Sequence, residues 1–319
     1  MKKLLIDLFT RAWAKTDVAT IVQIPTHEIT PTEIPLEKPV AVTSPAPKKY
    51  TYSPEKPQTL YFQRDGDARK IAYTISGDRN AEKTLLCLPG LLETKNSFAL
   101  VHDYFLSVEH CEVISVDFSG RGQSDSINNQ DEYKMSLYLN DLTHFINENI
   151  LAAKGSQKKI TVLGTSMGGV LAMYLTQHNG KAIDGVILND IALTVNWTAL
   201  YALYKSMKNQ KGFKGIRELA SDLRVDEQVI SDVQQPSHFD LPYKADVWGM
   251  NFHEALEGYR GKIALIYGDQ SKICTKQRVL EAKAHIPRLE TYAVAGAGHP
   301  APLNEAVCHF IQSQMGLRQ

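Results

Sequence analysis

A serine between two glycines is the residue of this chain best suited to nucleophilic chemistry. The stretch ITVLGTSMGGVL (160–171) holds the pattern Gly-x-Ser-x-Gly, with Gly164 and Gly168 on either side of Ser166. The β-branched run before the serine is typical of a buried strand, and apolar residues at helical spacing follow it. On such a strand–turn–helix elbow the backbone is tight and tolerates only small neighbours. The pattern therefore predicts a nucleophilic hydroxyl on Ser166, which needs a nearby base to take its proton.

Alternating strands and helices are predicted to position this serine. Apolar runs predict strands at 59–64, 70–77, 84–90, 111–120, 160–164, 185–192, 262–268 and 289–298, and helical patterns lie at 97–108, 133–152, 167–178 and 304–315. The first two strands are predicted to form a hairpin. The alternation that follows implies an α/β fold with a mainly parallel central sheet and helices on both faces. The mostly helical block 194–257 interrupts the alternation, so we expect it to form a cap over the strand ends.

Composition and charge exclude several functions. The 319 residues include 35 basic and 35 acidic side chains, and this balance argues against a broad nucleic-acid-binding surface. No apolar run approaches the roughly 18 residues of a membrane span. The four cysteines lack the spacing of metal ligands and are expected to be reduced thiols in the core of a cytoplasmic protein: Cys87, Cys111, Cys274 and Cys308.

The first 57 residues differ in composition from the rest. Eight of the 14 prolines lie between Pro25 and Pro57, a density that predicts an extended linker over 21–57. Residues 1–16 place apolar and charged side chains mostly on opposite sides of a short helix. Such a helix is typical of weak contact with a membrane surface or a partner protein, so the chain could also be peripheral to a membrane. We therefore expect an N-terminal extension over 1–57 and a globular domain over 58–319.

Three further motifs accompany the serine elbow in a fixed order. They are LLCLPGLLETKNSF (85–98), VDFSGRGQSD (116–125) and AGAGHPAPLNE (295–305). The first resembles an oxyanion loop, with Pro89-Gly90 where His-Gly is more usual. The second resembles the D-x-x-G-x-G-x-S turn after the fourth core strand, and the third resembles the turn of a catalytic histidine. Together with the elbow, these motifs make residues 58–319 similar to the serine α/β-hydrolases of the esterase and lipase type.

The resemblance implies a role for each of several residues. Ser166 is the expected nucleophile, and His299 is the expected general base because it follows the last core strand in a glycine-rich turn. The negative oxygen of the tetrahedral intermediate is best met by backbone N–H groups, for which we expect Leu91 and Met167. Asp117 and Arg121 are expected to hold their own turn together, which is a structural role.

The acidic member of the triad is where the chain departs from this family. The usual acid lies three or four residues beyond the glycine that ends the seventh core strand, where this chain has Ser271 and Lys272. Neither can accept a hydrogen bond from the imidazole as a carboxylate does. Asp190, at the end of the preceding core strand, and Asp269, directly after Gly268, are the two replacements. We favour Asp190 and keep Asp269 as the alternative.

These residues together predict a cofactor-independent hydrolase, without a metal, that cleaves carboxylic esters through an acyl-enzyme on Ser166. The many aromatic residues of the predicted cap suit a small apolar ester-type substrate. Thioesterases, lactonases, acyltransferases and C–C hydrolases use the same constellation, and the motifs do not separate them. An alternative of another class is a degenerate α/β-hydrolase that binds a small molecule or serves as a scaffold, since the usual acid is missing.

Overall fold

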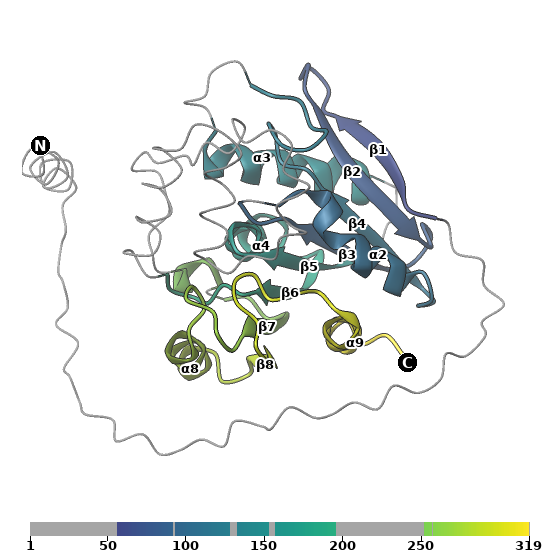
Figure 1. The fold of residues 1–319 in the computed structure, drawn as a ribbon. Helices are drawn as coiled ribbons and strands as arrows, with labels where there is room; N and C mark the ends of the chain where they lie inside the picture. The colour runs from purple at the N-terminus through teal and green to yellow at the C-terminus, as the bar shows by residue number, and fades with distance from the viewer. Residues whose placement is uncertain are drawn as a thin grey trace, which may run out of the picture. The chain divides into compact units, whose positions relative to one another are not determined.

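A single eight-stranded sheet forms the centre of the part of the chain that the computed structural model describes, which comprises residues 56–91, 93–127, 133–152, 157–195, 252–256 and 258–318. Its strands are β1 (Gln58–Gln63), β2 (Lys70–Gly77), β3 (Lys83–Leu88), β4 (Cys111–Val116), β5 (Lys159–Thr165), β6 (Ile183–Asn189), β7 (Lys262–Gly268) and β8 (Glu290–Val294). Their order is β1-β2-β4-β3-β5-β6-β7-β8 (Figure 1). Strands β3 to β8 are parallel, whereas β1 and β2 form an antiparallel hairpin beside β4. The predicted hairpin and the mainly parallel sheet are confirmed.

Helices cover both faces of this sheet. They are α2 (Ala99–Phe105), α3 (Met135–Phe145), α4 (Met167–Asn179), α8 (Lys276–His285) and α9 (Glu305–Gln314), with short helical turns η1 (Lys95–Phe98), η3 (Ile146–Ile150) and η5 (His253–Leu256). Figure 1 shows α3 and α4 on one side of the sheet and α2 and α9 on the other. The four predicted helices are confirmed. Helix α8 was not predicted, because only Val279 and Ala282 of its ten residues are buried and the apolar pattern is weak.

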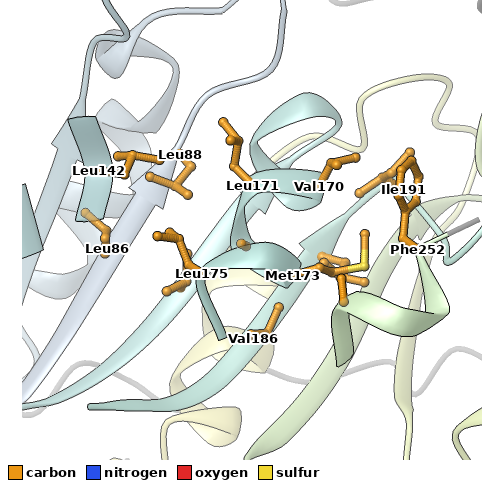
Figure 2. Packing of buried hydrophobic residues seen from close by; sticks show 14 of the residues in the cluster. Leu86, Leu88, Leu142, Val170, Leu171, Met173, Leu175, Val186, Ile191 and Phe252 are labelled. Atoms are coloured by element: carbon orange, nitrogen blue, oxygen red, sulfur yellow. The ribbon is translucent and has the colours of Figure 1, made fainter. Parts of the chain in front are cut away.

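The alternation of side chains along each strand divides the core between the two faces. On β3, Leu86 and Leu88 pack with α3 and α4, whereas Leu85 and Cys87 pack with α2 and α9. Figure 2 shows Leu175 of α4 beside Leu86 and Leu88 of β3. Parallel strands buried on both faces must be apolar almost throughout, and this requirement explains runs such as TVLG in β5. All four cysteines are buried and free.

The segment predicted as a cap, 194–257, lies mostly outside the described residues, as does the N-terminal extension before Lys56. The two ends of the cap segment are described, and they meet, because the Phe252 N–H donates to the Leu193 carbonyl at 2.7 Å. Phe252 and Ala255 are buried beside α4, where Figure 2 places Phe252 next to Ile191. The insertion therefore leaves and re-enters the core at one place. Within the described part of the chain, no helix has the length and apolar character needed to cross a bilayer.

A buried histidine connects α2 to the sheet. The His102 Nδ1 atom lies 2.6 Å from the Ser76 hydroxyl of β2, and its Nε2 atom lies 2.9 Å from the Ser115 hydroxyl of β4. The residue is only 2% exposed. Burial lowers the pKa of His102 from its ordinary value of 6.5 to about 4. The imidazole is therefore neutral in the folded protein at neutral pH.

We predict that this histidine makes the fold less stable in mild acid. Between pH 6.5 and about 4 the unfolded chain binds a proton at residue 102 that the folded chain does not, so the free energy of unfolding falls as the pH falls. At about 1.4 kcal/mol per pKa unit, the loss from this group is at most roughly 3 kcal/mol. Urea denaturation of the wild type and of His102→Gln at about pH 7 and about pH 5 measures it. The wild type should lose more stability than the variant, and equal losses would contradict the assignment.

Candidate active site

The predicted functional residues lie on the loops that follow the carboxyl ends of the parallel strands. From β3 the chain crosses to β4 on one side, and then returns to β5 on the other side of β3. Ligands of open α/β sheets bind at such a reversal of strand order, because the loops there diverge and leave a crevice. Gly90 and Leu91 follow β3, and Ser166 follows β5. The topology therefore brings the expected oxyanion loop and the expected nucleophile to one point.

Ser166 has the strained backbone of a nucleophile elbow. Its φ of 49° and ψ of −112° lie outside the regions that L-residues usually adopt. Its N–H donates to the Asn189 carbonyl of β6 at 2.9 Å, which extends the sheet by one residue and fixes the turn. A Cβ atom on Gly164 would lie 2.3 Å from the Gly168 carbonyl oxygen, so residue 164 must be a glycine. The side chain is held where strand β5 ends and helix α4 begins.

A chain of two hydrogen bonds connects Ser166 to a buried carboxylate. The His299 Nε2 atom lies 3.1 Å from the Ser166 hydroxyl oxygen, and its Nδ1 atom lies 2.6 Å from Asp190 Oδ2. Asp190 is completely buried, and His299 is 7% exposed. With the proton of a neutral imidazole on Nδ1, facing the carboxylate, Nε2 is free to accept the proton of the serine. The three residues thus have the geometry of a nucleophile, a base and an orienting acid.

Asp190 is held in this position by the strands next to it. Its backbone has a φ of 58°, and its N–H donates to the Ile266 carbonyl of β7 at 2.7 Å. Its Oδ1 atom accepts a hydrogen bond from the Gly268 N–H at 3.1 Å, and its Oδ2 atom accepts one from the Ser271 hydroxyl at 2.8 Å. Ser271, one of the two positions where the resemblance led us to expect an acid, therefore supports the carboxylate of Asp190.

The alternative acid, Asp269, points elsewhere. Its Oδ1 atom accepts a hydrogen bond from the Gly296 N–H at 2.8 Å, at an exposed turn between β8 and the His299 loop. Asp269 therefore stabilises the turn that precedes the His299 loop. The carboxylate that contacts the imidazole is that of Asp190. A second stabilising contact comes from Asn189, whose side-chain amide donates to the Ala301 carbonyl at 3.0 Å and to Thr165 Oγ1 at 3.2 Å. Asn189 thereby connects the loop that carries His299 to the end of β5, directly before Ser166.

The start of α4 packs directly against the loop after β3. A Cβ atom on Gly168 would lie 2.2 Å from the Leu88 carbonyl oxygen and 2.7 Å from that of Pro89. Only glycine permits this approach, which brings the start of α4, with the Met167 N–H at its first position, close to the loop that was expected to supply an oxyanion donor. The first N–H groups of a helix have no partner within the helix and carry partial positive charge. The Met167 N–H is therefore available to a developing negative oxygen.

Glu93, in the loop after β3, was not assigned a role at the site from the sequence. Glu93 is 5% exposed, and its Oε2 atom accepts a hydrogen bond from the Gly90 N–H at 2.5 Å. Burial raises the pKa of Glu93 from 4.5 to about 7, although the Gly90 N–H, the nearby His299 and the Thr165 hydroxyl favour its ionised form. A carboxylate in the otherwise apolar run LPGLLE is the signal that would have identified it.

Arg121 makes contacts outside the turn that it was predicted to stabilise. The predicted structural role fits Asp117, whose carboxylate accepts hydrogen bonds from the Lys95 and Gln123 N–H groups and pairs with the Lys95 ammonium at 3.0 Å. Arg121 instead donates from Nη1 to the Gly90 carbonyl at 3.2 Å. Its Nη2 atom lies 3.9 Å from the Met167 sulfur. This arginine therefore contacts both segments that were predicted to supply oxyanion donors.

Comparisons with known proteins agree with the observed fold. A family described as the alpha/beta hydrolase fold matches residues 83–213. A 3-hydroxybutyrate-oligomer hydrolase of Cupriavidus necator is 23% identical over 272 residues, which cover 72% of this chain and 87% of that protein.

Solved structures are similar over almost their whole length. An alpha/beta hydrolase from Novosphingobium aromaticivorans superposes with a TM-score of 0.65 and 21% identity, covering 82% of this chain and 98% of that one. A structure from work on carboxylesterases of Nitrososphaera gargenis has a TM-score of 0.63 and 17% identity, covering 81% of this chain and 99% of that one. Likeness at this level of identity establishes the fold and leaves the reaction to be argued from the site.

Proposed function

Because this chain has the α/β-hydrolase fold, we propose that it is a serine hydrolase that cleaves carboxylic esters through an acyl-enzyme on Ser166. The observation that carries the proposal is the chain of hydrogen bonds from Ser166 through His299 to Asp190. A serine hydroxyl attacks a carbonyl only when a base removes its proton, and this arrangement supplies the base and orients it. The strained elbow supports the proposal, since such backbone strain concentrates at functional sites.

The reaction proceeds in two halves. Ser166 Oγ attacks the ester carbonyl carbon while its proton passes to His299 Nε2, and the carbonyl oxygen becomes an oxyanion facing the Met167 and Leu91 N–H groups. Collapse of this intermediate breaks the bond to the alcohol, which takes the proton from His299 as it leaves. A water molecule, deprotonated by His299, then attacks the acyl-enzyme and releases the acid. Asp190 stabilises the imidazolium at both stages.

Carboxylic esters are favoured over related acyl substrates by the comparison with the hydrolase of 3-hydroxybutyrate oligomers. Thioesters, lactones and C–C bonds next to a carbonyl react through the same steps, as does acyl transfer to an acceptor other than water. The alternative of a degenerate binding or scaffold protein rested on the missing acid at residues 271 and 272. It loses its main support because Asp190 occupies the position that the imidazole needs.

We predict measurable hydrolysis of simple esters by the purified chain. The test compares kcat/KM for p-nitrophenyl esters of graded acyl length, 3-hydroxybutyrate oligomers, and an acyl thioester matched in chain length to the best ester. An ester should be the best substrate of this set, because we assign the site to ester cleavage. Preference for the thioester by more than about tenfold, equal to about 1.4 kcal/mol, would move the assignment to a thioesterase. No turnover of any of these substrates would support the binding-protein alternative.

A further inference from the structure

Gly90, in the loop after β3, is held by side chains on both of its polar groups. Its N–H donates to the Glu93 carboxylate at 2.5 Å, and its carbonyl accepts a hydrogen bond from Arg121 Nη1 at 3.2 Å. The Glu93 N–H also donates to this carbonyl at 3.2 Å. The two side chains arrive from different segments, since Glu93 belongs to the same loop and Arg121 belongs to the turn after β4. Neither group of Gly90 is left to turn toward a substrate.

The direction of the next N–H follows from peptide geometry. In a trans peptide the carbonyl of one residue and the N–H of the next point in opposite directions. Arg121 holds the Gly90 carbonyl toward its own guanidinium, so the Leu91 N–H points in the opposite direction within the same peptide plane. A glycine has no side chain to restrict rotation of this peptide, which would otherwise turn easily. The two polar side chains supply that restriction.

Both side chains are themselves held in place. Arg121 is 1% exposed, and its guanidinium lies 5.5 Å from the ring centre of Phe118 and 5.3 Å from that of Tyr138. Glu93 is buried, it interacts with Thr165, the residue before Ser166, and it lies near His299. A buried, charged group is costly unless its hydrogen bonds are made. These buried polar groups therefore hold the loop through directional hydrogen bonds, which an apolar contact would not provide.

We propose that Glu93 and Arg121 are positioning residues that hold the Gly90–Leu91 peptide and so aim the Leu91 N–H at the oxyanion of the reaction. The inference rests on the proposed function, because it assigns a role in stabilising an intermediate of that reaction. Neither residue touches the substrate; each acts through Gly90. Preorganised donors are effective because they need no reorientation when the charge develops. Loss of either residue should therefore slow the chemical step and leave substrate binding nearly unchanged.

The test measures kcat, KM and inhibition for Glu93→Ala, Glu93→Gln and Arg121→Lys. Removing one oxyanion donor costs on the order of 10²–10³ in kcat, so loosening one should cost about 10- to 100-fold in Glu93→Ala, with KM changed by less than about threefold. Glu93→Gln should recover most of this loss, because the amide oxygen accepts the same N–H. Arg121→Lys should lose about tenfold in kcat, because a lysine lacks the planar fork.

The second measurement is the inhibition constant of a trifluoromethyl ketone that carries the acyl chain of the best ester. This constant reports on oxyanion stabilisation and not on the overall stability of the fold. Its adduct with Ser166 carries an oxyanion at the same position, so its inhibition constant should rise by the same factor as kcat falls. The matched control is Glu112→Ala, which removes another buried carboxylate. Glu112 lies near the start of β4, at the end of the strand away from Arg121, and it pairs with Lys158. This control should leave kcat and the inhibition constant unchanged, even where its melting temperature falls.

Several results would overturn the inference while leaving the proposed function standing. They are an unchanged kcat in folded Glu93→Ala or Arg121→Lys, a rise in KM alone, or no recovery in Glu93→Gln. If Glu93→Ala does not fold, Arg121→Lys decides the question by the same two readouts. Lack of turnover by the wild type would instead contradict the proposed function itself.

Discussion

Replacement of Asp190 by asparagine (Asp190→Asn) is expected to lower kcat by about 10⁴, the scale on which a triad fails when its acid becomes an amide. The carboxylate accepts the Nδ1 proton of His299 at 2.6 Å and keeps Nε2 free to act as a base. An amide at residue 190 can donate to Nδ1, which would move the imidazole proton to Nε2 and block transfer from Ser166. Steady-state kinetics with the best ester measure the loss.

Asp269→Asn is the matched control for this prediction. Both aspartates directly follow the end of a core strand, but the Asp269 carboxylate accepts a hydrogen bond from the Gly296 N–H at an exposed turn. Its replacement should change kcat by less than about tenfold. A larger effect at residue 269 than at residue 190 would assign the acid to Asp269. Mild effects at both would indicate a Ser–His dyad.

The neighbouring serine offers a rescue of the same defect. The Ser271 hydroxyl lies 2.8 Å from Asp190 Oδ2, which is the atom that contacts His299. In the Asp190→Asn background, Ser271→Asp should place a carboxylate near the same imidazole nitrogen and recover at least about tenfold in kcat. Lys272→Asp tests the other position where an acid was expected from the resemblance, and its effect should be smaller because Ser271 is the residue in contact with Asp190.

Replacement of the nucleophile is expected to have the largest effect of all. Ser166→Ala should lower kcat by about 10⁶, as expected when the attacking group of a triad is removed. The fold should persist, because the hydroxyl contributes only its hydrogen bond to His299 and alanine is small enough for the elbow. Kinetics and thermal melting measure the two effects, with Ser313→Ala on the exposed face of α9 as the control. Hydrolysis by Ser166→Ala at the wild-type rate would exclude the mechanism.

Most of the fold could be predicted from the sequence because parallel strands buried on both faces must be apolar. The runs that predicted β3 to β7 contain most of each observed strand, and the run KIALIYG coincides with β7 (Lys262–Gly268). Helix α8 was not predicted from the sequence because it lies at the surface and buries only two side chains. Its helical character depends on residues whose propensity is a weak signal without an apolar stripe.

Within the site, Ser166 and His299 could be identified because each lies in a local pattern of glycines around a strand end. For the acid, Asp190 was favoured and Asp269 was kept as the alternative, because the direction of each carboxylate depends on hydrogen bonds between strands distant in sequence. Asp190 is turned toward His299 by a φ of 58° and by the Gly268 N–H. The contacts of Glu93 and Arg121 with Gly90 have the same origin, because Arg121 lies 31 residues from its partner.

The most direct test of the central claim is to find where a serine-directed reagent binds covalently. The full chain is treated with a fluorophosphonate, and its mass is measured before and after digestion into peptides. We predict one phosphonyl group per chain on the peptide that contains Ser166, with labelling much slower in Asp190→Asn and undetectable on that peptide in Ser166→Ala. Labelling of a different residue, or no labelling of the folded wild type, would contradict the assignment of Ser166 as the nucleophile.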